Sequence, residues 1–172
     1  MPLSYFSNTG LYTPAATNTI LFAQTAGYNG RVQEVSWGGY LTAWTIGHVN
    51  RYRAAVAGAA VSDVTLSYSL SDINHGVAAQ WEYRGDPWRQ PEHFDRVNPI
   101  RSAIRMKTPT LVLHGQADAR VPFQSSIQLY RALADLGVEV RFWAYPREDN
   151  GFVEPAHRVH YIRAWVDWYD AH

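Results

Sequence analysis

The chain has 172 residues, of which 47% are hydrophobic and 14% aromatic, so it can bury the core of one domain. Its zero net charge favours neither nucleic acid nor a membrane surface as a partner, and the absence of cysteine excludes disulfides, thiol chemistry and cysteine–zinc sites. No apolar run approaches the roughly 20 residues of a membrane span. The first basic residue is Arg31, so the charged start of a signal peptide is missing. We therefore expect a soluble, cytoplasmic protein.

The pattern of secondary structure changes at Arg31. Residues 1–30 contain no charged side chain and suggest one short strand, at Ile20 to Ala23. From Arg31 onward, short apolar runs alternate with helical patterns. Strands are predicted at 31–35, 53–58, 110–114 and 138–144, and residues 63–90 look irregular, with short helices at most.

Helices are predicted after three of these strands. The first follows Ser36, the second runs from Pro122 until Gly137 stops it, and the third begins near Pro155. The side chains expected to share one face are Leu41, Trp44, Thr45 and His48 in the first helix, Phe123, Ile127, Tyr130 and Ala134 in the second, and Tyr161, Trp165 and Trp168 in the third. This alternation predicts an α/β fold with a mainly parallel sheet, in which ligands bind at the carboxyl ends of the strands.

Ser36 stands between a predicted strand and a predicted helix, as in the nucleophile elbow G-x-S-x-G. That turn is tight and needs small residues around the serine. Gly38 fits the pattern, whereas Glu34 occupies the place of the first glycine and would crowd the neighbouring strand or helix. The alternative is a serine that caps the helix. The motif alone favours the cap.

Asp118 lies in the loop after the strand at 110–114. An ionised carboxylate only accepts hydrogen bonds, which suits it to orient an imidazole on a neighbouring loop. Alternatively, Asp118 caps the helix that starts near Pro122, or it pairs with Arg120. The local sequence favours neither interpretation.

Four motifs occur in order along the chain: Ser-Trp-Gly-Gly-Tyr from Ser36, His114 to Ser125 around Asp118, Tyr145 to Glu148, and Gly151 to Arg158. As a set, they resemble the prolyl oligopeptidase family of serine peptidases, especially its acylaminoacyl-peptidase and dipeptidyl-peptidase-like branches. The resemblance implies the C-terminal part of an α/β-hydrolase catalytic domain, a truncated, mainly parallel sheet with helices on both faces.

The resemblance also implies roles for individual residues. Ser36 matches the nucleophile, Asp118 the acid of the catalytic triad, and the backbone N–H of Trp37 an oxyanion donor. The position that matches the triad histidine is Asn150, whose amide cannot take up the serine proton. His157 matches another position that is ordinarily histidine, and we expect it to be a partly buried helix residue.

Other histidines offer no clear replacement for the missing base. His114 ends a strand, where a structural role is expected. His157 and His160 have the spacing of two metal ligands, but no set of carboxylates accompanies them, so we predict neither a metal nor a cofactor.

The resemblance begins at residue 31, so we divide the chain into an unmatched segment, 1–30, and a partial hydrolase domain, 31–172. The strands that precede the nucleophile strand in the family, and the loop that supplies part of the oxyanion hole, have no evident counterpart, and neither does the family's β-propeller. The open sheet edge that this implies favours a homodimer or larger assembly.

Three functions follow from these observations. The leading hypothesis is a truncated serine-hydrolase domain that is inactive, or nearly so, because of Asn150. The second is an active peptidase or esterase, acting on peptides or acyl esters, whose site another residue or chain completes. The third is a non-enzymatic module that binds another chain through its sheet edge.

Overall fold

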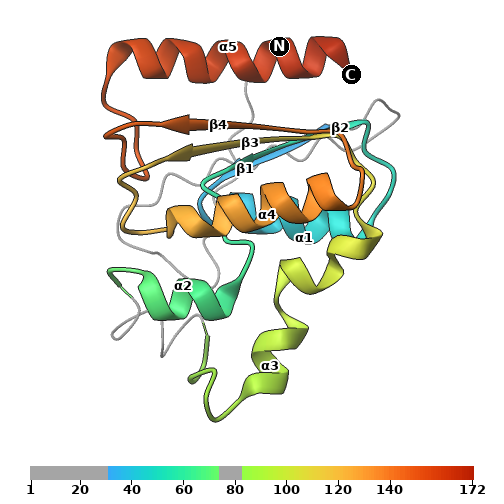
Figure 1. Cartoon of the computed structure of the whole chain (residues 1–172), viewed down its shortest axis with the longest axis vertical. Helices are drawn as coiled ribbons and strands as arrows, with labels where there is room; N and C mark the ends of the chain where they lie inside the picture. The colour runs from blue at the N-terminus through green and yellow to red at the C-terminus, as the bar shows by residue number, and fades with distance from the viewer. Residues whose placement is uncertain (1–30, 74–82) are drawn as a thin grey trace, which may run out of the picture.

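A parallel sheet forms the centre of the molecule. The computed structural model describes residues 31–73 and 83–172, with side chains from Ser36 onward. The sheet has four strands: β1 (Arg31–Val35), β2 (Ala54–Gly58), β3 (Thr110–Gly115) and β4 (Val140–Tyr145). They lie in the order β1-β2-β3-β4, and every neighbouring pair is parallel (Figure 1). The predicted sheet is therefore confirmed, while the strand expected at Ile20 to Ala23 lies outside the described residues.

Helices cover both faces of the sheet, as expected. α1 (Trp37–His48) and α4 (Phe123–Asp135) lie on one face, and α5 (Pro155–Ala171) lies on the other (Figure 1). All residues of β2 and β3 are buried because each strand is covered from both sides. None of the helices in the described ranges is long and apolar enough to cross a membrane.

The core consists of separate apolar clusters on the two faces of the sheet. Val112 of β3 belongs to the cluster that contains Ile46 of α1 and Leu129 of α4. Its neighbour Leu111 points the other way and packs in the cluster that contains Trp168 of α5. Because successive side chains of a strand face opposite sides, the apolar run of β3 serves both clusters.

The chain between β2 and β3 forms short helices below the sheet (Figure 1). These are α2 (Val64–Leu70), α3 (Pro91–Arg96) and the 3₁₀ helix η2 (Pro99–Arg105). Asp63 starts α2, since its Oδ1 accepts hydrogen bonds from the N–H groups of Thr65 at 2.8 Å and Leu66 at 3.0 Å. The expected irregular region with short helices is thus confirmed for its described part, which excludes residues 74–82.

The inward faces of α1 and α4 differ from the prediction. In α1, Ala43 and Ile46 are buried, whereas Leu41 is 40% exposed. In α4, Leu129 is buried, whereas Tyr130 is 36% exposed. The larger side chains of α1 instead stack on one another: the rings of Tyr40, Trp44 and His48 form a continuous row. Several of the buried residues of α1, such as Gly39, Ala43 and Gly47, are small and let this helix approach its neighbours closely, which the spacing of apolar residues does not reveal.

The inward face of α5 agrees with the prediction. Trp168 is buried, and Tyr161 and Trp165 pack partly buried against the same cluster. Pro155 is the first residue of the helix, where proline is favoured because its missing N–H needs no partner.

Candidate active site

Ser36 occupies a strained turn at the carboxyl end of β1. Its backbone has φ 62° and ψ −122°, in the region that non-glycine residues rarely adopt. Its N–H donates to the carbonyl of Gly58 at 2.9 Å, which ties the turn to the end of β2. Ser36 holds the N-cap position of α1, yet its side chain makes no capping hydrogen bond. This strained strand-to-helix turn has the form of a nucleophile elbow.

Gly39 allows α1 to begin directly against the end of β2. A Cβ atom on this residue would lie 2.4 Å from the carbonyl oxygen of Gly58 and 2.7 Å from the Cα of Ala60. Such contacts are far shorter than packed atoms allow, so only glycine fits. The sequence pattern drew attention to Gly38, whereas the close approach depends on the next residue.

The N–H of Trp37 lies in the first turn of α1, where backbone donors have no partner within the helix. No hydrogen bond links this N–H to another described residue. It therefore has the character expected of an oxyanion donor beside Ser36. Glu34, the departure from the glycine pattern, pairs with Ala57 in the regular register of β1 and β2, so it does not interrupt the strand.

Asp118 is buried, and both of its carboxylate oxygens accept hydrogen bonds. Oδ1 accepts from the N–H groups of Arg120 at 2.9 Å and Val121 at 2.8 Å, which holds the loop after β3 in shape. The guanidinium of Arg120 bonds to Asp72 instead, which raises the pKa of Arg120. Asp118 therefore does not form the ion pair with Arg120 that was one of its predicted alternatives.

Asn150 bonds directly to Asp118. Its Nδ2 donates to Oδ2 of Asp118 at 2.9 Å, across 32 positions of sequence. This is the hydrogen bond that a triad histidine would make to its acid. The amide reproduces the donor but carries no nitrogen that can take up a proton near neutral pH.

The three predicted residues lie at the same edge of the sheet. Ser36 follows β1, Asp118 follows β3 and Asn150 follows β4. β3 and β4 are neighbours, whereas β2 lies between β1 and β3, so the strand before Ser36 is not adjacent to the strand before Asp118. Within the described part of the chain, no hydrogen bond joins Ser36 to Asp118 or Asn150.

A sequence profile of a known protein family matches most of this chain. The profile of the prolyl oligopeptidase family covers residues 32–172. The chain belongs to the prolyl oligopeptidase family. The resemblance seen in the four sequence motifs is thereby confirmed.

Individual relatives agree with the family assignment. The chain is 30% identical over 138 residues to "Uncharacterized peptidase YuxL" of Bacillus subtilis, covering 77% of this chain and 21% of that protein. It is 34% identical over 128 residues to the human acylamino-acid-releasing enzyme, covering 69% of this chain and 17% of that protein. The acylaminoacyl peptidase of Pyrococcus horikoshii superposes with a TM-score of 0.74 at 26% identity, over 81% of this chain and 23% of that chain.

These comparisons confirm the α/β-hydrolase-like fold of the described region. The chain spans about a fifth of the length of these relatives. The activities of the whole relatives therefore extend to this chain only as proposals.

His114 supports the loop of Asp118 from beneath and is completely buried. Its Nδ1 lies 2.6 Å from Oγ of Ser126, and its Nε2 lies 3.1 Å from Oδ2 of Asp118 and 3.0 Å from the carbonyl of Val121. Both ring nitrogens are thus occupied, which agrees with the expected structural role. Sequence reasoning missed the contact with Asp118, although the spacing of four residues within the motif was visible.

Glu148 and His157 hold the loop that carries Asn150. Glu148 is fully buried and accepts hydrogen bonds from the N–H groups of Val153 and Glu154 and from Nδ1 of His157 at 2.8 Å. Burial by itself raises the pKa of Glu148, but these hydrogen bonds outweigh it and hold the pKa below its ordinary value. Sequence analysis did not identify this network, which joins the two ends of the loop around Asn150.

The same residues form a group with the spacing of metal ligands. The ligand atoms of Glu148, Glu154 and His157 lie within 4.8 Å of one another. Glu154 is already bonded to the guanidinium of Arg147 at 2.8 Å, and both oxygens of Glu148 already accept hydrogen bonds. His160 lies apart from the group and bonds to the hydroxyl of Tyr145. This arrangement favours a structural network over a metal centre.

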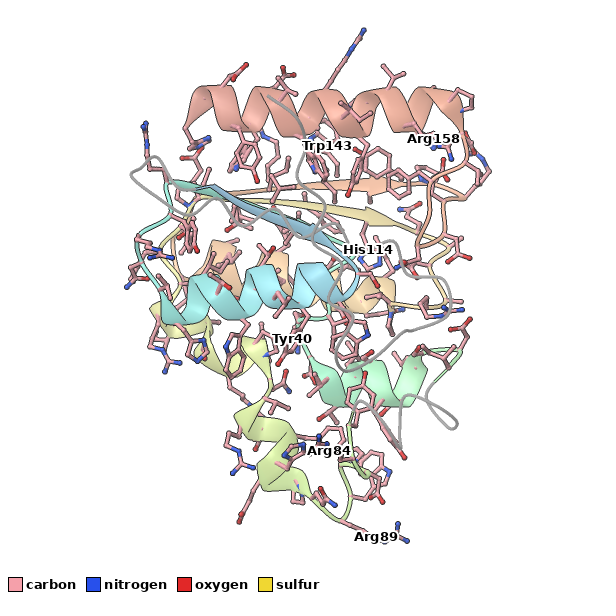
Figure 2. The ribbon with its side chains drawn as sticks, turned by 180° about the vertical axis from the view of Figure 1, so that it is seen from behind. Tyr40, Arg84, Arg89, His114, Trp143 and Arg158 are labelled. Atoms are coloured by element: carbon pink, nitrogen blue, oxygen red, sulfur yellow. The ribbon has the colours of Figure 1, made fainter. Side chains whose placement is uncertain are left out.

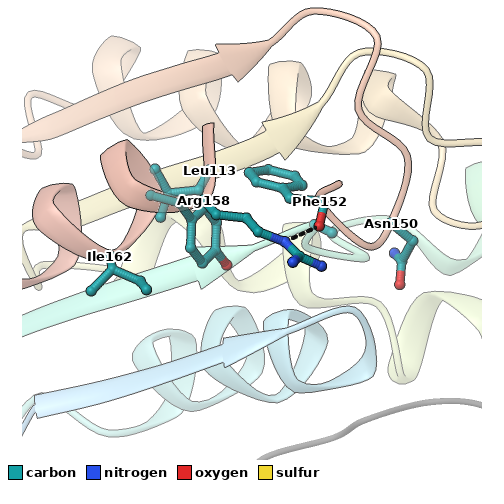
Figure 3. A pocket seen from close by; sticks show the side chains of 7 residues that line it. Leu113, Asn150, Phe152, Arg158 and Ile162 are labelled. Carbon is teal, nitrogen blue, oxygen red and sulfur yellow. Dashed lines mark hydrogen bonds between the residues drawn. The ribbon is translucent and has the colours of Figure 1, made fainter. Parts of the chain in front are cut away.

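A cavity of about 380 Å³ opens beside Asn150 on the α5 side of the sheet. Its lining is largely apolar and includes Leu113, Phe152 and Ile162 (Figure 3). Arg158 crosses it and donates from Nε to the carbonyl of Phe152 at 2.6 Å. The edge of the sheet formed by the carboxyl ends of the strands therefore has an open cavity next to Asn150.

Proposed function

We propose that this chain carries the catalytic site of a prolyl oligopeptidase-family serine peptidase with its hydrolytic chemistry impaired at Asn150. Ser36 is the nucleophile, Asp118 the triad acid and the Trp37 N–H an oxyanion donor. The observation that carries the proposal is the 2.9 Å hydrogen bond from Nδ2 of Asn150 to Asp118. In this proposal, the amide of Asn150 stands in for the imidazole that would take the proton of Ser36.

The chemical reason is that a serine hydroxyl is a poor nucleophile near neutral pH. A base must remove its proton during attack and return it to the leaving group. Asn150 can donate to Asp118 but cannot accept that proton, so the site has an acid and a nucleophile without a base. Loss of the base in such a triad costs a factor of roughly 10⁴ to 10⁶ in rate.

Peptides or acyl esters are the proposed ligands, since the relatives are named as peptidases and acylamino-acid-releasing enzymes. One solved acylaminoacyl peptidase holds Z-Gly-Gly-Phe-chloromethyl ketone, and its likeness to this chain has a TM-score of 0.76 at 26% identity. An activated ester of an acylated phenylalanine is therefore a suitable test substrate.

Restoring the base tests the proposal. Asn150→His should raise turnover of the ester by about 10-fold or more, because triad members act as a unit. Asn150→Gln is the matched control, since it keeps an amide and should give no gain. The double variant with Ser36→Ala should lose the gain, and labelling with a serine-reactive phosphonate should follow the same order. Substantial turnover by the unaltered chain that disappears in Ser36→Ala would contradict the proposal.

A second candidate is a site or interface completed by another copy of the chain. β1 is the terminal strand of the described sheet and pairs only with β2 there. On α5, Val159, Ile162 and Val166 are each about half exposed and recur at helical spacing. Exposed strands and apolar stripes of this kind recruit other chains.

Light scattering at micromolar concentration tests this assembly, which we expect to be a homodimer or larger. Val166→Glu should then lower the solution mass, because it places a charge in the apolar stripe. A monomer in the unaltered chain would refute this candidate and leave the Asn150 proposal unaffected.

A further inference from the structure

A second cavity, of about 260 Å³, lies on the opposite side of the sheet from α5, next to α1, α2 and α3. Four aromatic side chains line it: Trp37, Tyr40, Tyr83 and Phe94. Their rings brace one another, with centroids 5.3 Å apart for Trp37 and Tyr40 and 5.6 Å apart for Tyr83 and Phe94. The hydroxyl of Tyr40 donates to the carbonyl of Val97 at 2.8 Å, which holds the ring of Tyr40 in place in the lining of the cavity. The cavity is therefore a preformed aromatic pocket.

Two nitrogen-bearing side chains, Arg84 and His93, complete the lining. Nδ1 of His93 lies 3.3 Å from the guanidinium of Arg96 and can only accept there, so Nε2 carries the hydrogen and is a donor. No carboxylate belongs to the described lining of the cavity. The polar part of this pocket consequently offers hydrogen-bond donors and positive charge.

Arg84 is held in an uncommon conformation. Its φ is 55°, in the left-handed region, and the following Gly85 also has a positive φ. The side chain of Gln90 bonds to the carbonyl of Arg84 and packs so closely on Gly85 that a Cβ there would lie 2.6 Å from it. Strain of this kind persists where surrounding structure imposes it, often at ligand sites.

The guanidinium of Arg84 differs from that of its neighbour in the same turn. Arg89 forms an ion pair with Asp86 at 2.7 Å, whereas Arg84 forms no ion pair with a described residue. Figure 2 shows Tyr40 and Arg84 on the same side of the sheet and Arg89 at the far tip of the molecule. Arg84 is thus a cation at an aromatic pocket, with a chemically matched arginine nearby that lines no such pocket.

We propose that this cavity binds an aromatic carboxylate, with the ring among the aromatic side chains and the carboxylate on Arg84 and His93. Aromatic walls favour stacked or edge-on rings, and a guanidinium forms strong charge-assisted hydrogen bonds with a carboxylate. The volume of about 260 Å³ lies slightly below the roughly 300–1,000 Å³ of drug-sized ligand pockets, so it suits a small ligand such as a single aromatic residue. The inference concerns binding and holds whether or not Ser36 supports hydrolysis.

Binding of N-acetyl-phenylalanine and of its uncharged amide tests the proposal, measured by calorimetry in the full chain carrying Ser36→Ala. That background removes hydrolysis, so failure of the catalytic proposal cannot affect the result. We expect the acid to bind about 10-fold or more tightly than the amide, because only the acid can form charge-assisted hydrogen bonds with the guanidinium of Arg84. Added salt should reduce the difference in affinity between the acid and the amide, because it screens the attraction between the carboxylate and Arg84.

Variants then assign the preference to one side chain. Arg84→Gln should abolish the preference for the acid, Arg84→Lys should keep part of it, and the matched control Arg89→Gln should keep it all. Circular dichroism shows whether each variant folds. The effect of salt on the affinities for acid and amide is measured without substitution in the pocket, so it tests the proposal even if a variant fails to fold. Equal affinity for acid and amide, no binding of either, or an unchanged preference in folded Arg84→Gln would each overturn the proposal.

Discussion

Replacing Gly39 with alanine tests how closely α1 must approach the end of β2. The added Cβ would lie 2.4 Å from the carbonyl oxygen of Gly58 and 2.7 Å from the Cα of Ala60, both backbone atoms that cannot rotate away. Overpacking of this kind costs about 1–3 kcal/mol, and the directness of the clash places this case at the upper end. Alanine regains about 1 kcal/mol of helix propensity over glycine. We therefore expect a net loss of about 2 kcal/mol in the free energy of unfolding.

Urea unfolding followed by tryptophan fluorescence measures this loss. For a chain of this size, about 2 kcal/mol corresponds to a fall of roughly 4–8 °C in melting temperature. Gly151→Ala is the control, because it makes the same chemical change where a Cβ would meet nothing within 4 Å. If Gly39→Ala proves as stable as the control, α1 does not need this close approach, and the account of the turn at Ser36 is refuted.

Two further predictions concern the residues around the site. Ser36→Ala should change the free energy of unfolding by less than about 0.5 kcal/mol, whereas a serine that capped α1 would cost about 1 kcal/mol; urea unfolding distinguishes the two. Glu148→Gln should destabilise the chain by about 1–3 kcal/mol at neutral pH, because the amide cannot accept all the hydrogen bonds that Glu148 receives. The folded pKa of Glu148 is lowered, so its contribution is present above the ordinary value of 4.5 and is lost as the pH falls through the folded pKa. Unfolding across the acid range should therefore show a shallower pH dependence in Glu148→Gln than in the unaltered chain.

The sequence was sufficient for the features that depend on local pattern. The alternation of apolar runs with helical segments predicted the parallel sheet, and the order of four short motifs predicted the family. The same motifs predicted that Ser36, Asp118 and Asn150 each follow a strand. Such residues lie at one edge of the sheet, because the carboxyl ends of parallel strands share that edge. Each strand, helix and motif in these inferences consists of residues that are close together in the chain.

The tertiary structure decided which side chains meet across the chain. The buried faces of α1 and α4 depend on how closely each helix approaches the sheet, which spacing does not record. Ser36 combines a positive φ with a hydrogen bond to Gly58 of the next strand, and Asn150 bonds to Asp118, which lies 32 positions away in the sequence. Partners for buried polar groups are chosen in three dimensions, because an unpaired buried donor or acceptor is costly wherever its partner lies in the sequence.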